Sequence, residues 1–328
     1  MIVQALEKIL AAHCAVTDVR RIEAGGDGAV LWQAVEQGGF LELLAPADRG
    51  GAGLPLSELF AVFECLGRFA PPLPISHAMA ARALVKDAGS LPAGMITLAS
   101  QFERAADGAM KCLATPFGTL ADFVLATSAD SLFLMPAHAA RRTAVGDPRA
   151  LTADLHWDSG ASMVEVAGFG SALLPFAAAM TAALQCGAMQ RVLSMSLDYC
   201  NQRAQFGKPL GKFQAIQQQL SVMAEHVLAS MVAAESAFCG EAAHPPLLAA
   251  AVAKARTSEA GALVAATAHA VHGAIGMTDE YDLGVFTRKL QDWRAAYGAE
   301  NQWNALVGRS LLESEAPLLD FVRGTLPA

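Results

Sequence analysis

The sequence has 328 residues, of which 54% are apolar and only 16% are charged, and its formal net charge is -8. This length allows two or three domains with a sizeable core, and the low charge content favours extensive burial and a subunit interface. The acidic balance argues against a nucleic-acid binder, which needs basic patches.

The six cysteines are scattered along the chain, with no C-x-x-C pair and no histidine partner at zinc spacing. We therefore expect no metal site, and we interpret the cysteines as buried thiols of a cytoplasmic protein. The apolar start of the chain is interrupted by Glu7 and Lys8 and is followed by no cleavage site. No signal peptide is predicted.

Sequence patterns divide the chain into three regions. Residues 1–90 have a helical pattern that breaks at the Gly/Pro-rich segment 46–55 and stops at the prolines of 71–74. Residues 91–170 contain short apolar runs (123–125, 132–135 and 163–166) between Asp, Gly, Ser and Pro, which is typical of short strands. Residues 171–328 return to a helical pattern. We predict a mainly α protein with a helical N-terminal domain, a small β middle domain and a C-terminal four-helix bundle.

Two apolar stripes support the helical bundle, because steps of three and four residues place side chains on one helix face. The first stripe consists of Phe213, Ile216, Leu220, Met223, Val227 and Met231, and the second of Leu283, Phe286, Leu290, Trp293 and Tyr297. Segment 171–189 is nearly uncharged and about as long as a membrane span. Its high alanine content, with Pro175 and Gln185, favours a buried bundle helix.

Two motifs resemble those of acyl-CoA dehydrogenases. Residues 203–217 read R-A-Q-F-G-K-P-L-G-K-F-Q-A-I-Q and resemble the family's R-x-x-F-G-x-x-(I/L)-x-x-F-Q-x-(I/V)-Q segment. Residues 271–281 read V-H-G-A-I-G-M-T-D-E-Y and resemble its H-G-G-x-G-(F/Y)-T-x-E-Y turn, with Arg288 at the spacing of the family's arginine. Segments 46–54 and 64–68 resemble its P-x-x-x-G-G-x-G-L and E-x-L-G-R patterns. The resemblance is strong over 171–308, fair over 31–74 and poor between.

The first motif has residue types that suit a dinucleotide. Arg203 can offer a guanidinium fork to a pyrophosphate, and Phe206 offers an apolar face to the adenosine half. Gly207 permits a sharp turn, and Gln214 adds a directional hydrogen bond. The resemblance implies that these four residues bind the ADP half of an FAD held mainly by a neighbouring subunit.

The resemblance adds Leu210 and Gly273 to this set of cofactor-binding residues. The alternative to FAD binding is structural: Arg203 would cap a helix and Phe206 would be a core aromatic residue.

The resemblance also indicates that the catalytic base is missing. The family uses a carboxylate to remove the α-proton of an acyl-CoA while a hydride passes to the flavin. Ungapped counting places Tyr297 at the commoner base position and Ala177 at the rarer one, so we predict no catalytic residue. If the alignment slips, Glu280, Asp292 and Glu300 could substitute, although a solvated surface charge is the default interpretation of each.

The middle region lacks the family's flavin-holding patterns. Neither the T-E-P-x-x-G-S-D stretch nor the W-(I/S/T) strand occurs in 91–170, and segment 115–118 (T-P-F-G) is the nearest fragment. In the H-G-G turn, Ala270 and Ala274 stand where the family has a glutamine and its second glycine. The half that would cradle this chain's own flavin is therefore lost, whereas the half that reaches a neighbour's flavin partly survives.

This asymmetry resembles the short, degenerate subunit of heteromeric acyl-CoA dehydrogenases, notably those acting on steroid side-chain CoA esters. The resemblance implies a full-length partner subunit that carries the base, an FAD shared between unlike chains, an acyl-CoA substrate and a role in lipid or steroid catabolism. No nucleic acid or membrane is expected as a partner. Two alternatives stay open: a self-sufficient homo-oligomeric enzyme with a displaced base, and a scaffold or binding protein that keeps only the fold.

Overall fold

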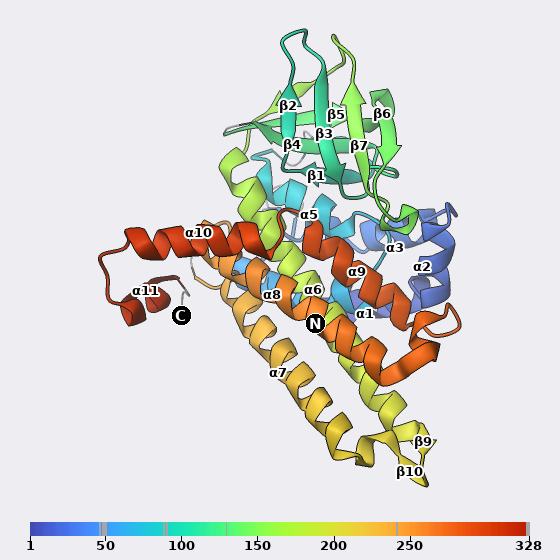
Figure 1. Cartoon of the computed structure of the whole chain (residues 1–328). Coiled ribbons are helices and arrows are strands. Elements are labelled where there is room, and N and C mark those ends of the chain that lie inside the picture. The colour runs from blue at the N-terminus through green and yellow to red at the C-terminus, as the bar shows by residue number, and fades with distance from the viewer. Residues whose placement is uncertain are drawn as a thin grey trace.

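The computed structural model describes residues 1–45, 47, 51–87, 89, 91–128, 130–240 and 242–325. Short helices at the N-terminus are followed by a β region and then by long helices (Figure 1). The three predicted domains stay a prediction, but the type of secondary structure changes between Leu84 and Ile96 and again between Val166 and Leu173. Part of the 46–54 motif, at 46 and 48–50, lies outside the described residues.

The N-terminal region is helical, as its pattern predicts. Its helices are α1 (Ile2–His13), α2 (Val16–Glu23), α3 (Ala29–Gln37), α4 (Leu59–Phe69) and α5 (Ile75–Leu84). Helix α4 ends at Ala70, whose φ of 49° is left-handed, and two prolines follow. Proline cannot continue a helix, so the chain turns there and begins α5 in a new direction.

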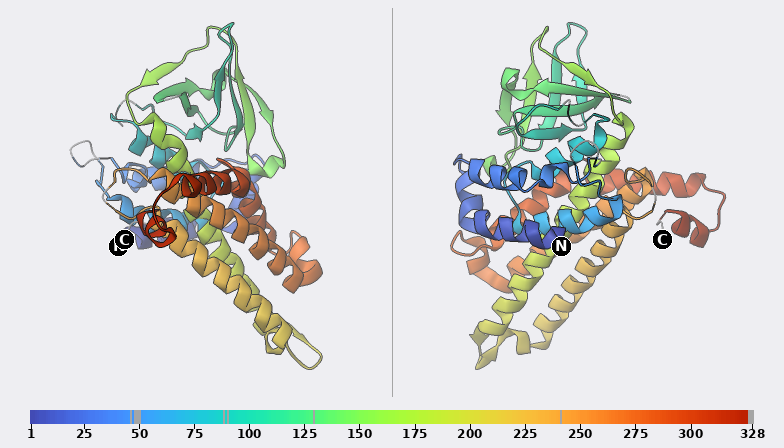
Figure 2. Two further views of the ribbon diagram at one scale, coloured as in Figure 1. Left: turned by 60° about the vertical axis from the view of Figure 1, so that its left-hand side comes forward. Right: turned by 180° about the vertical axis from the view of Figure 1, so that it is seen from behind.

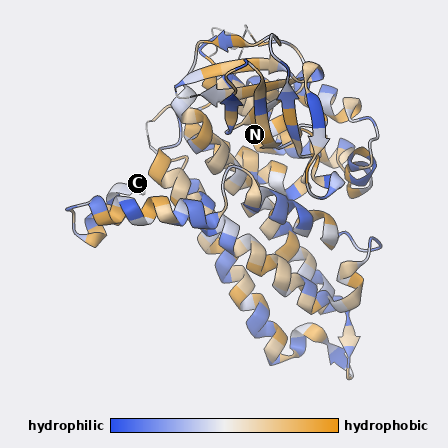
Figure 3. Ribbon diagram, turned by 45° about the horizontal axis from the view of Figure 1, so that its top comes forward, coloured by the Kyte–Doolittle hydropathy of each residue, from blue (hydrophilic) through white to orange (hydrophobic). Residues whose placement is uncertain are grey.

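The β region consists of two four-stranded sheets, ordered β1-β4-β5-β8 and β2-β3-β7-β6. The strands are β1 (Ile96–Ala99), β2 (Phe102–Arg104), β3 (Met110–Thr115), β4 (Phe123–Ser128), β5 (Ser131–Pro136), β6 (Arg141–Ala144), β7 (Ala153–Trp157) and β8 (Val164–Val166). The β1–β4 pair is parallel and the other pairs are antiparallel. Figure 3 shows hydrophilic and hydrophobic residues mixed along these strands, as expected where one face is buried. The three predicted apolar runs lie in β4, β5 and β8.

The C-terminal region contains α6 (Leu173–Gln202), α7 (Gln214–Ser236), α8 (Leu247–His272), α9 (Leu283–Ala295), α10 (Glu300–Glu313) and α11 (Leu318–Thr325). Helices α6 to α9 pack against one another, and α10 packs against α8. The mainly α fold with a small β region and a C-terminal helical bundle is therefore confirmed. All five residues of the second apolar stripe are buried, as are the central residues of the first, Leu220, Met223 and Val227.

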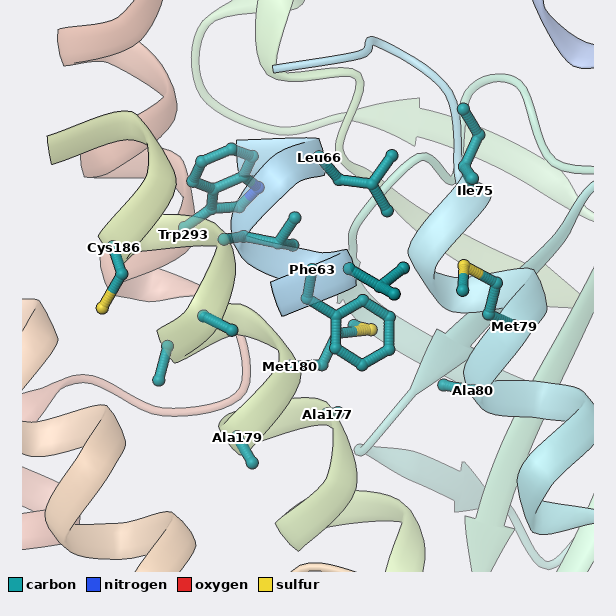
Figure 4. Packing of buried hydrophobic residues seen from close by; sticks show 14 of the residues in the cluster. Phe63, Leu66, Ile75, Met79, Ala80, Ala177, Ala179, Met180, Cys186 and Trp293 are labelled. Atoms are coloured by element: carbon teal, nitrogen blue, oxygen red, sulfur yellow. The ribbon is translucent and has the colours of Figure 1, made fainter. Parts of the chain in front are cut away.

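Helix α6 is the central element of the core. It crosses α4 very closely, since a Cβ built on Gly67 would lie 2.1 Å from the Leu184 carbonyl oxygen and one on Gly187 would lie 2.0 Å from that of Glu64. Glycine is thus required on both helices. Beside this crossing, Phe63 packs on Met180 and other apolar side chains of α6 (Figure 4). Although α6 and α8 are both long and apolar enough to cross a membrane, 89% of the apolar window of α6 is buried within the protein, as expected for a core helix.

The α6–α7 pair extends away from the body of the molecule as an arm. Its end carries β9 (Ala204–Gln205) and β10 (Lys208–Pro209) and lies opposite the β region (Figures 1 and 2). Helix α6 has 30 residues, so it spans about 45 Å from the β region to this tip.

Candidate functional site

The tip of the arm holds most of the predicted cofactor-binding residues. Strands β9 and β10 form a hairpin in which Gln205 pairs with Lys208. The two residues between them, Phe206 and Gly207, have φ values of 52° and 80°. Two consecutive left-handed residues are the geometry of a tight hairpin turn, so Gly207 turns the chain as its motif predicts.

The side chains of the tip point into open space. Phe206 is 91% exposed and contacts the ring of Phe213 edge-on at 6.3 Å. The interpretation of Phe206 as a core aromatic residue is therefore wrong. Arg203 is also exposed, and within the described chain only its backbone is bonded: its N–H donates to the Tyr199 carbonyl and its carbonyl accepts from Leu210, both at 2.8 Å. The guanidinium is free to bind an external group.

The remaining predicted cofactor-binding residues differ in how far they are buried. Gln214 is exposed in the first turn of α7, where its side chain makes no hydrogen bond to another described residue. Leu210 is half-buried against a small apolar cluster that includes Cys200 and Val271. Gly273 is exposed at the end of α8, with a left-handed φ of 64°. Leu210 thus anchors the tip, whereas Gln214 and Gly273 face solvent.

The tip is a cationic surface. Segment 203–212 contains Arg203, Lys208 and Lys212 and no acidic residue. The Lys208 ammonium lies 4.4 Å from the centre of the Phe213 ring, a cation–π contact that holds it on the exposed side of the hairpin. An exposed cluster of cations beside a free aromatic ring suits a ligand with phosphates and a flat base.

A second candidate site is a cavity of about 570 Å³ between the β region and the end of α9. Four segments line it: 100–101, 113–117 from the end of β3, 145–152, and 289–302 from α9 to the start of α10. Pro116 and Phe117, from the T-P-F-G fragment that matched the family only weakly, are among its walls. The cavity could not be found from sequence, because its walls are far apart along the chain.

The commoner base position is occupied by a buried tyrosine. The Tyr297 hydroxyl donates to the Leu98 carbonyl at 3.0 Å, and its ring lies 5.8 Å from that of His77. His77 Nδ1 is 2.9 Å from Thr97 Oγ1, which donates to the Pro116 carbonyl at 2.6 Å. This network could not be predicted from the sequence, since a lone histidine in an apolar helix carries no motif.

Burial keeps this network uncharged. It raises the pKa of Tyr297 well above its ordinary value and lowers that of His77 to about 3. The rarer base position, Ala177, is fully buried in α6 and lies in the core (Figure 4). Among the described residues, neither position offers a group that can accept a proton from a substrate.

The three substitute carboxylates have different surroundings. Glu280 is exposed in the turn before α9. Glu300 is paired with Arg294, whose Nε lies 2.9 Å from Oε2, and hydrogen bonds from Arg294 lower the pKa of Glu300 to about 2. Asp292 lines the cavity, and burial raises its pKa against the opposing effect of Lys289. Of the three, Asp292 is the one that lines this cavity.

Comparison with known proteins identifies the class to which this fold belongs. The family model described as "Acyl-CoA dehydrogenase, C-terminal domain" matches residues 167–312. Acyl-CoA dehydrogenase IpdE2 of Mycobacterium tuberculosis is 29% identical over 293 residues, covering 88% of this chain and 89% of the relative. Residues 167–312 are therefore similar to the C-terminal domain of acyl-CoA dehydrogenases, and the similarity to IpdE2 extends over most of the chain.

Solved structures show the same fold over nearly the whole chain. The ChsE4-ChsE5 complex from Mycobacterium tuberculosis superposes with a TM-score of 0.82 at 22% identity, covering 96% of this chain and 97% of the other. The Tcur3481-Tcur3483 steroid ACAD G363A variant superposes with a TM-score of 0.81 at 25% identity, covering 95% and 97%. The β region and the helical bundle of this chain thus have the arrangement seen in these two structures.

This family implies FAD as the cofactor, and the two candidate sites fit different parts of it. Lys289 is the one cation in the described cavity lining, and its ammonium is paired with Glu23 at 2.8 Å. The other charged lining residues are Asp147 and Asp292, so the cavity suits an uncharged ring but not a pyrophosphate. The cationic tip suits the pyrophosphate but lies at the far end of α6. The cavity and the cationic tip therefore differ in charge and lie far apart in this chain.

Proposed function

We propose that this chain is a subunit of an FAD-dependent acyl-CoA dehydrogenase that lacks its own catalytic base and completes the FAD site of a full-length partner subunit. The observation that carries the proposal is the contrast between the two sites. Tyr297 fills the base position as a neutral, hydrogen-bonded side chain, whereas Arg203 and Phe206 stand free at the end of an arm. Such a chain cannot remove the α-proton but can bind a neighbour's cofactor.

The residues of the tip have separate roles in this proposal. Arg203 binds the pyrophosphate through its guanidinium fork, and Phe206 covers the adenosine half. Gly207 gives the hairpin its turn, Gln214 and Gly273 contribute polar contacts, and Leu210 fixes the hairpin to the helices. FAD held by these residues would supply the acceptor for the hydride of the acyl-CoA.

The relatives support a heteromeric arrangement and a steroid-type substrate. ChsE4-ChsE5 is a complex of two differently named chains, and Tcur3481-Tcur3483 is described as a steroid ACAD. By analogy, we infer that the acyl group is bulky and that the reaction is the α,β-dehydrogenation of a steroid side-chain CoA ester in lipid catabolism. The cysteines, all six of them free, fit the reducing cytoplasm in which we expect the protein to work.

Co-expression with a full-length homologue tests this proposal. We expect a yellow complex that contains about one FAD for each pair of unlike chains, because only the partner keeps a complete flavin cradle. The complex should oxidise an acyl-CoA, and a partner variant without its catalytic carboxylate should be inactive. A stable complex that contains no FAD would instead favour a scaffold protein.

Asp292 supports one second candidate, a self-sufficient homo-oligomeric enzyme. Its carboxylate lines the cavity and has a raised pKa, as a displaced base would need. Under this alternative, the chain alone would bind FAD and oxidise an acyl-CoA, and Asp292→Asn would abolish turnover with the fold intact. The matched Glu280→Gln variant, on an exposed carboxylate, would keep the activity.

A further inference from the structure

The turn between α9 and α10 has a backbone conformation that needs outside support. Tyr297 and Gly298 are consecutive left-handed residues, with φ values of 57° and 99°. A bulky side chain in this region is strained, so the turn would relax unless neighbouring groups fixed it. Gly298 has no alternative, since an added Cβ would lie 2.8 Å from Gln302 Oε1 and 2.9 Å from Trp303 Nε1.

A lysine from another helix binds the main chain on both sides of this tyrosine. Lys254 of α8 is fully buried, and its ammonium donates to the carbonyls of Arg294 and Gly298, both at 3.0 Å. It also donates to Ser258 Oγ at 2.9 Å. All three protons of the ammonium therefore have acceptors, which is what a buried lysine requires.

A tryptophan completes the support from the other side of the turn. Trp303 Nε1 of α10 donates to the Tyr297 carbonyl at 3.1 Å. The carbonyls of Arg294, Tyr297 and Gly298 are thus all held by buried side-chain donors from α8 and α10. With its carbonyl held here and its hydroxyl bonded to Leu98, Tyr297 is fixed at both ends.

We propose that Lys254, assisted by Trp303, is a positioning residue that holds Tyr297 as a plug in the space that a base and an acyl group would occupy in this chain. A buried lysine is costly, and an apolar residue would fill the α8–α9 contact at lower cost if packing were its purpose. Burial lowers the pKa of Lys254 to about 7, and both of its protonation states can still donate to the two turn carbonyls.

This inference rests on the proposed function in one respect: the α9–α10 turn is taken as the base-bearing turn of the family. Its test needs neither FAD nor a partner subunit. If Lys254 proves not to hold Tyr297, the shared-FAD proposal is unaffected. If the complex proves not to bind FAD, the proposal that Lys254 holds Tyr297 is unaffected.

Chemical nitration of tyrosine by tetranitromethane, followed by mass spectrometry of peptides, measures how accessible the Tyr297 ring is. Tyr199 and Tyr281 are half-buried and serve as internal references in the same molecule. In the parent protein, Tyr297 should react far more slowly than either. Lys254→Met keeps the length of the side chain but removes the donors, and it should raise the nitration rate of Tyr297 about tenfold, as the loss of one to two buried hydrogen bonds implies.

Lys289→Met is the matched control, because Lys289 is also buried but bonds to Glu23 rather than to the turn. It should destabilise the protein while leaving Tyr297 as protected as in the parent. Trp303→Phe provides a second variant if Lys254→Met does not fold, and it should raise Tyr297 nitration in the same direction. The proposal would be overturned if Tyr297 were nitrated as slowly in every folded variant of Lys254 and Trp303 as in the parent. It would also be overturned if Lys289→Met raised the nitration rate of Tyr297 as much as Lys254→Met does.

Discussion

Replacing Arg203 by alanine should weaken FAD binding by the complex without unfolding this chain. The guanidinium is exposed and has no partner among the described residues, and the two hydrogen bonds that Arg203 makes at the end of α6 come from its backbone. Because Ala keeps that backbone, the free energy of unfolding should change by no more than about 0.5 kcal/mol.

The substitution should instead reduce the affinity of the complex for FAD. A charge-assisted hydrogen bond from a guanidinium to phosphate contributes on the order of 2 kcal/mol, so the dissociation constant of FAD should rise roughly thirtyfold. Arg203→Lys should restore only part of the affinity, because lysine keeps the charge but lacks the planar fork.

The assay is the FAD content of the co-expressed complex, titrated by flavin absorbance after removal and readdition of the cofactor. Arg309→Ala is the matched control, since Arg309 is an exposed arginine on α10, away from the tip. A folded Arg203→Ala complex that holds FAD as tightly as the parent would show that the arm does not touch the cofactor. An unfolded variant would instead support the helix-cap interpretation of Arg203.

Three further predictions concern catalysis, pH and association. Purified alone, the chain should not reduce an electron acceptor with any acyl-CoA above the flavin background; turnover that disappears in Asp292→Asn would move the assignment to a self-sufficient enzyme. The free energy of unfolding of the parent, relative to that of Lys254→Met, should rise between about pH 7 and pH 10.5, because in that range the unfolded chain binds a proton that folded Lys254 has released. Urea denaturation at several pH values measures both free energies, and the same dependence on pH in the two proteins would contradict this. The exposed apolar residues Leu228 and Val232 of α7, with Phe206, predict a buried interface, so light scattering should show a dimer or tetramer, alone or with the partner; a monomer beside every full-length homologue would be evidence against it.

The sequence by itself predicted the features that depend on neighbouring residues. The stripe from Leu283 to Trp293 follows the helical period, and the runs in β4 and β5 lie between turn-forming residues, so both elements are encoded locally. The sharp turn at Gly207 was also predictable, because its motif is continuous and its glycine meets a local backbone requirement. The family followed from such continuous segments.

Contacts between distant segments decided the rest. The second stripe extends to Tyr297 by spacing alone, yet α9 ends at Ala295 and the tyrosine packs beyond it, bonded to Leu98 some 199 positions away. Phe206 has an apolar side chain, but it is exposed because no described residue outside the α6–α7 arm packs against it. Lys254 lies in an alanine-rich helix with no motif around it, and its partners are 40 and 44 residues away. Whether a side chain fills a site, stays exposed for binding or supports a turn from inside the core depends on which segments fold against it. Local sequence patterns carry no information about those distant partners.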